Sequence, residues 1–164
     1  QSFEFNASIY YIFRQIGYWI TGYNQIGLIG KITPIIVVAI TLYISFKNIN
    51  LKKFSENKIT FDFEGFIKKA GFILFCYYIF SSIVHPWYLI NLVFISIFIK
   101  NRVYLIWSIT VFLSYFAYSN YMNINYPNYS YHESSLYYFV VFFEYLSLLI
   151  YLIYFKKRNK IKLA

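Results

Sequence analysis

The sequence predicts an all-α, polytopic bundle of about five transmembrane helices, with one further amphipathic helix at the outer membrane surface. Of the 164 residues, 60% are apolar and only 13% are charged, a composition that soluble domains of this length rarely have. The apolar residues form runs, and the basic residues lie in short blocks between the runs. The net charge of +9 therefore indicates membrane topology, and no nucleic-acid partner is expected.

The first element, residues 1–25, is predicted to be an outer interfacial segment. Its apolar side chains recur at helical spacing: Ile9, Ile12, Phe13, Ile16, Trp19 and Ile20. Arg14 lies largely on another part of this helix, and Gly22 is expected to end it. Such a helix lies in the membrane surface with its aromatic rings at headgroup level and does not span the bilayer.

Five apolar runs follow and predict the spans of a single membrane domain, 1–164: residues 26–46, 70–84, 87–99, 103–118 and 136–155. A helix needs about 20 residues to cross about 30 Å of hydrocarbon. The third run is shorter than this, so it must recruit flanking aromatic residues or lie in a thinned bilayer.

The basic residues predict the orientation. Three segments hold 13 of the 15 lysines and arginines: 47–69, 100–102 and 156–164. With five spans these segments share one side, which the positive-inside rule assigns to the cytoplasm. The first is then a cytoplasmic linker and the last a basic cytoplasmic tail. Residues 1–25, the turn at His85 and Pro86, and the 119–135 loop are expected outside.

The stretch SSIVHPWYLIN, beginning at Ser81, is the most unusual interruption of the apolar sequence. Pro86 has no backbone N–H and disfavours helical geometry at the preceding residue, so the second span is predicted to end at His85. Trp87 and Tyr88 suit the membrane interface. The stretch is either a structural turn or a binding site, because an imidazole at this depth can donate a hydrogen bond to a phosphate or a sugar hydroxyl.

Two further residues are candidates for ligand contact. Arg14 is a second possible phosphate partner, or else it extends to lipid headgroups. Glu144 lies within the last span, where a carboxylate costs about 2.5–3.5 kcal/mol to insert, so it should face a cavity or a polar partner. Its alternative role is that of a neutral acid bonded to a tyrosine or to Asn91. No HExxH or paired-carboxylate spacing occurs, so no metal is expected.

Four segments together carry a family resemblance: FEFNASIYYIFRQIGYWITGYN, SSIVHPWYLIN, RVYLIWSITVFLSYFAYS and FFEYL. They resemble the C-terminal part of bacterial multispanning mannosyltransferase-like proteins of the GT-C class, which transfer sugars from polyprenyl-phosphate carriers. The run from Ser81 to Tyr88 is its most specific piece. The resemblance implies an inverting glycosyl transfer at the outer face of a bacterial cytoplasmic membrane, from the lipid-linked sugar to a glycan or lipid-linked acceptor.

In this interpretation His85 and Arg14 would stabilise the departing phosphate, and the substrate-binding candidates are His85, Trp87, Tyr88, Arg14 and Glu144. No cofactor is expected. The resemblance also implies that the catalytic carboxylate lies in a first outer loop upstream, so this chain would be the carrier-binding half of a longer protein. Two alternatives stay open: a lipid-linked sugar flippase or polymerase, and a non-catalytic membrane subunit.

Overall fold

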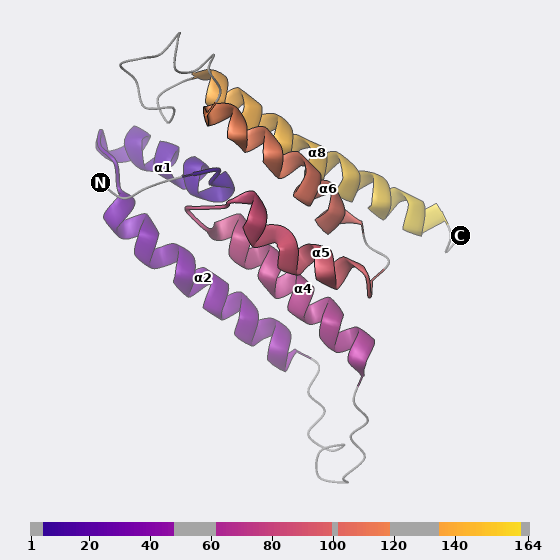
Figure 1. The fold of residues 1–164 in the computed structure, drawn as a ribbon. Coiled ribbons are helices and arrows are strands. Elements are labelled where there is room, and N and C mark those ends of the chain that lie inside the picture. The colour runs from indigo at the N-terminus through magenta and orange to yellow at the C-terminus, as the bar shows by residue number, and fades with distance from the viewer. Residues whose placement is uncertain (1–4, 48–61, 100–101, 119–134, 162–164) are drawn as a thin grey trace.

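The computed structural model describes residues 5–47, 62–99, 102–118 and 135–161, and it is helical throughout these ranges apart from short connections (Figure 1). The predicted all-α class is confirmed for this part of the chain, which holds no strand. Its elements, in order, are α1 (Ser8–Thr21), α2 (Ile26–Phe46), α4 (Phe63–Phe80), η1 (Pro86–Leu89), α5 (Ile90–Ser96), α6 (Val103–Thr110), η2 (Val111–Tyr118) and α8 (Ser135–Ile161).

The helical segments α2, α4, η1 with α5, α6 with η2, and α8 run side by side and alternate in direction along the chain (Figure 1). The start of α2, the end of α4 and the start of α8 lie at one end of the bundle, and α1 lies at this same end. Lys47 and Arg102 adjoin helix ends at the opposite end. The bundle therefore separates Arg14 in α1 from these basic residues.

Two helices are long and apolar enough to cross a membrane, judged by length and composition: α2 and the part of α8 from Tyr137 to Phe155. Only 11% of the α2 window and 17% of the α8 window are buried, unlike a core helix of a soluble protein. The apolar helices Pro86–Ser96 and Val103–Phe116 are shorter. Two apolar helices indicate a membrane protein, and the bundle of five spans stays a prediction.

The ends of α1 and α4 follow from local capping. Gly22 ends α1 as predicted, because it adopts φ 77° and its N–H donates to the Tyr18 carbonyl at 2.9 Å, a left-handed cap that glycine allows without strain. The Asp62 carboxylate accepts from the Gly65 N–H at 2.9 Å. This N-cap starts α4 at Phe63, seven residues before the apolar run begins at residue 70. Residues 48–61, 119–134 and 162–164 of the predicted loops and tail lie outside the described ranges.

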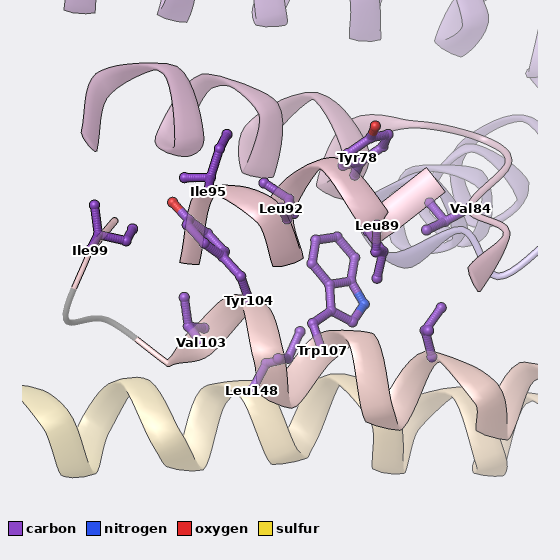
Figure 2. Close-up of a cluster of buried hydrophobic side chains, with 11 residues drawn as sticks. Tyr78, Val84, Leu89, Leu92, Ile95, Ile99, Val103, Tyr104, Trp107 and Leu148 are labelled. Carbon is purple, nitrogen blue, oxygen red and sulfur yellow. The ribbon is translucent and has the colours of Figure 1, made fainter. Parts of the chain in front are cut away.

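The main hydrophobic core is centred on Trp107 of α6. Figure 2 shows its indole beside Leu89 and Leu92, and Leu148 of α8 extends toward α6. All four side chains are buried in one cluster. Gly71 of α4 allows the close approach of the neighbouring helices, since a Cβ there would lie 2.8 Å from the Cγ2 of Ile95. Small residues serve such contacts between packed membrane helices.

Candidate functional site

The stretch after α4 is extended and pairs with the N-terminal segment. The prediction that the second span ends at His85 is wrong, because α4 ends at Phe80. The Phe5 N–H donates to the Ser82 carbonyl at 3.1 Å, and the Val84 N–H donates to the Phe5 carbonyl at 2.9 Å. These bonds satisfy backbone groups that helix α4 would otherwise have used. His85 itself is extended, with φ −85° and ψ 151°, as expected before a proline.

The imidazole of His85 lies in a stack of aromatic rings. Its centroid is 4.3 Å from that of Trp87, with the planes 9° apart, and 4.7 Å from that of Phe5, with the planes 26° apart. Tyr88 meets the imidazole edge-on at 5.4 Å. The two stacked rings fix the orientation of the imidazole. We refer to His85, Trp87 and Tyr88 as the aromatic corner.

The aromatic corner is open to its surroundings on the side of Trp87 and Tyr88. Trp87 is 57% exposed and Tyr88 is 38% exposed, whereas Phe5 is fully buried. Burial lowers the pKa of His85 below its ordinary value of 6.5, because a partly desolvated imidazole disfavours its charged form. His85 is therefore a neutral hydrogen-bonding group near neutral pH.

Glu144 lies in a buried polar cluster next to this corner. Its Oε1 accepts a hydrogen bond from Asn6 Nδ2 at 3.0 Å and another from Trp107 Nε1 at 2.8 Å. Asn6, Trp107 and Glu144 each have no exposed surface. Glu144 Oε2 and Asn6 Oδ1 have no hydrogen-bond partner within the described residues. Neither Asn91 nor a tyrosine is the donor to Glu144 here: Asn91 donates instead to the Tyr78 hydroxyl at 3.5 Å.

Two tyrosines of α8 hold the backbone of Asn6. The Asn6 N–H donates to the Tyr137 hydroxyl at 2.9 Å, and the Tyr145 hydroxyl donates to the Asn6 carbonyl at 2.9 Å. Asn6 has a φ of 52°, a conformation that asparagine tolerates better than most residues. We call Asn6, Trp107, Tyr137, Glu144 and Tyr145 the polar cluster. Through Phe5 and Asn6, which are adjacent in the chain, it adjoins the aromatic corner.

Arg14 faces the bundle from α1. Its guanidinium donates to the Tyr138 hydroxyl and lies over the rings of Tyr11, at 5.1 Å, and of Tyr138, at 5.7 Å. These contacts connect α1 to α8. Arg14 thus contacts Tyr11 and Tyr138, and Glu144 contacts Asn6 and Trp107.

The structure thus brings together three of the five predicted site residues, His85, Trp87 and Tyr88, and places Arg14 and Glu144 elsewhere. Contact of any of the five with a substrate stays a prediction. Sequence reasoning missed Phe5 and Asn6, which carry no local motif. Within the described residues no three His, Cys, Asp or Glu side chains gather where they could hold a metal ion.

The chain was compared with protein-family models, with characterised proteins and with solved structures, and no match was found in any of the three. A proposal about function therefore depends on the geometry of the aromatic corner and on the resemblance of the four sequence segments.

Proposed function

We propose that this chain is the carrier-binding part of an integral membrane glycosyltransferase, similar to the mannosyltransferase-like proteins of the GT-C class. In this proposal the aromatic corner receives the sugar phosphate of a polyprenyl-phosphate carrier at the outer membrane surface. The observation that carries the proposal is the stack of His85 between Phe5 and Trp87, with Trp87 and Tyr88 exposed beside it.

The placement in a membrane is supported by α2 and α8. Both helices combine high apolarity with little burial, so most of their apolar surface needs a lipid or protein partner. The 21 residues of α2 give a helix of about 30 Å, the thickness of the hydrocarbon core. The connection between α4 and α5, which carries the aromatic corner, lies toward the end of the bundle where α2 begins (Figure 1). In this proposal a lipid carrier presents its headgroup at that end.

Sugar binding is supported by the exposure of Trp87. One face of its indole is covered by His85, and the 57% exposure of the residue leaves area for a ligand. The apolar C–H face of a pyranose packs on such a ring, while Tyr88 offers a hydroxyl for a hydrogen bond. The aromatic corner therefore combines apolar contact and hydrogen bonding at one position.

Phosphate stabilisation is assigned to His85. In an inverting transfer an acceptor oxygen attacks the anomeric carbon, the bond from that carbon to the phosphate oxygen breaks, and the carrier leaves as polyprenyl phosphate. A hydrogen bond from the imidazole N–H to the phosphate stabilises the charge that develops there. A separate carboxylate must take the acceptor proton. Glu144 has no exposed surface and already accepts two hydrogen bonds, so we assign it a positioning role.

The test measures sugar transfer by the full-length protein from a polyprenyl-phosphate sugar, with the His85→Ala and Trp87→Ala variants. We expect His85→Ala to lower turnover about tenfold or more, because a phosphate donor is lost. The matched control is Trp19→Ala, since Trp19 is 78% exposed at the same end of the bundle but lies outside the aromatic corner. This variant should retain turnover.

Unchanged turnover in both corner variants would contradict the proposal. If the complete protein transfers no sugar and the corner variants leave the function of its complex intact, the chain is a non-catalytic membrane subunit instead.

A further inference from the structure

A pocket of about 310 Å³ lies between α1, α2 and α4. Its α2 side is built around Gly30 and Pro34. Gly30 contributes no side chain, and a Cβ added there would have no atom within 4 Å. Proline has no N–H, so the helical bond from residue 34 to the Gly30 carbonyl is absent. Gly30 therefore leaves space on one face of α2, and Pro34 leaves the Gly30 carbonyl without its usual helical donor.

The lining of the pocket changes along the helix axis. On its side toward the start of α2, the pocket is lined by Thr33, Ser81 and Ser82. The hydroxyl of Thr33 donates to the Ile29 carbonyl at 3.2 Å, and that of Ser81 donates to the Ile83 carbonyl at 2.8 Å. About one turn deeper the pocket is lined by Val37 and Val38. This order along the helix, from hydroxyl-bearing to aliphatic side chains, matches the order of groups in a lipid from its glycerol to its acyl chain.

We propose that this pocket binds an acyl chain of an anionic phospholipid of the outer leaflet. The lipid phosphate lies beside Lys31, an exposed side chain that follows the pocket residue Gly30. Side chains on a helix tilt toward its N-terminus, so the Lys31 ammonium is directed toward the start of α2, on the headgroup side of Thr33. The inference rests on the membrane placement within the proposed function, but it does not depend on sugar transfer.

The pocket is distinct from the aromatic corner. None of His85, Trp87 and Tyr88 lines it, although Ser81 and Ser82 come just before them in the chain. The carrier headgroup and the phospholipid thus occupy separate places along the segment that follows α4. A phospholipid here would support α1 and the Ser81–Ser82 backbone, to which Phe5 is bonded.

The experiment uses phosphatidylglycerol with a photoreactive group in its acyl chain, added to the full-length protein in phosphatidylcholine nanodiscs. We expect adducts in α2 between residues 33 and 38 and in α4 near Tyr77. Gly30→Leu fills the pocket and should lower this labelling at least fivefold, about the effect of losing a small apolar contact site. Val38→Trp is a second variant with the same expected loss, since Val38 is an exposed pocket residue.

Gly27→Leu is the matched control, because Gly27 lies on the same helix, also has open space around a Cβ, and does not line the pocket. It should label like the parent. Lys31→Gln should lower phosphatidylglycerol labelling about fivefold, to the level of a photoreactive phosphatidylcholine, because one lysine near an anionic surface contributes this much.

Equal labelling of Gly30→Leu, Val38→Trp and the parent would overturn the inference. Loss of labelling on addition of a polyprenyl phosphate would also overturn it, because the pocket would then belong to the carrier. The turnover of each variant, measured on the same preparations, separates the two proposals: intact labelling with turnover that is insensitive to His85→Ala contradicts only the transferase.

Discussion

The aromatic corner and the polar cluster are neighbours joined through Phe5 and Asn6, yet they differ in what they leave open. In the aromatic corner, Trp87 is 57% exposed, and its ring stacks on His85 and meets Tyr88 edge-on. In the polar cluster, Glu144 has no exposed surface and hydrogen bonds join it to α6 and to the N-terminal segment. The dipeptide Phe5–Asn6 is therefore held by buried hydrogen bonds at Asn6 and lies next to the accessible rings of the aromatic corner at Phe5.

This difference separates two roles that residue type alone would not distinguish. A buried acid in an apolar helix suggests function by default, but the hydrogen bonds of Glu144 fix the position of Asn6 and, with it, of Phe5. The exposed rings of the aromatic corner have few bonds that stabilise the fold. Variants of the polar cluster should therefore change stability, whereas variants of the corner should change ligand binding.

The largest effect is expected for Glu144→Ala. The substitution leaves the buried donors Asn6 Nδ2 and Trp107 Nε1 without an acceptor, which should lower the free energy of unfolding by about 2–4 kcal/mol. Glu144→Gln keeps an oxygen acceptor and brings an amide that can donate to Asn6 Oδ1, so it should cost less than about 1 kcal/mol. The measurement is unfolding in mixed micelles titrated with a denaturing detergent. Equal losses for both variants would show that the hydrogen bonds do not hold the cluster.

The next effect concerns the backbone of Asn6. Asn6→Ala removes the hydrogen bond to Glu144. It also places at φ 52° an alanine, whose side chain cannot form the local hydrogen bonds that help asparagine to tolerate this conformation. The substitution should lower the free energy of unfolding by about 2 kcal/mol. Asn6→Gly removes the same bond but accepts the positive φ, so it should be about 1 kcal/mol less destabilising. The same unfolding titration checks this order, and a glycine variant less stable than the alanine variant would contradict it.

Trp87→Ala should change stability little and binding more. Because the side chain is largely exposed, the free energy of unfolding should change by no more than about 0.5 kcal/mol. Affinity for a short-chain polyprenyl-phosphate sugar should fall about fivefold, the worth of one aromatic contact of about 1 kcal/mol. The affinity is measured by isothermal titration of the ligand into the detergent-solubilised protein. The control is Trp87→Phe, which keeps an aromatic ring and should retain most of the affinity. A large loss of stability in Trp87→Ala would show that Trp87 stabilises the fold, which contradicts this prediction.

The smallest effect is a pH dependence from His85. Burial lowers its pKa in the folded chain below the unfolded value of 6.5, so the unfolded chain binds more protons between these two values. Its contribution to stability is therefore complete above pH 6.5 and is lost as the pH falls below it. The difference in melting temperature between the parent and His85→Gln, measured from pH 8 to pH 5, should shrink toward acid pH. A difference that grows toward acid pH would mean that a folded-state partner favours the charged imidazole.

Much of the helical scaffold could be predicted because its signals are local. The apolar run at 26–46 coincides with α2, and Gly22 ends α1 where the sequence places a helix stop. The start of α4 at Phe63 could also have been found, since Asp62 is a typical N-cap residue. These features depend on residues within a few positions of one another.

The candidate site could be predicted only in part. His85, Trp87 and Tyr88 are adjacent in the chain, and Pro86 marks the turn. The partners that orient them are remote: Phe5 pairs with Ser82 and Val84, and its neighbour Asn6 bonds to Glu144, 138 positions away. Neither hydrophobic periodicity nor turn chemistry predicts such pairing, so the early end of α4 was also missed.

The bond between Asn6 and Glu144 has a consequence for biosynthesis. Asn6 is synthesised well before its acceptor Glu144, which lies 138 positions later in the chain. A chain that stops short of α8 can still form the backbone bonds from Phe5 to Ser82 and Val84, but it lacks the α8 side chains that fix Asn6. The aromatic corner therefore gains its full support only after α8 has joined the bundle.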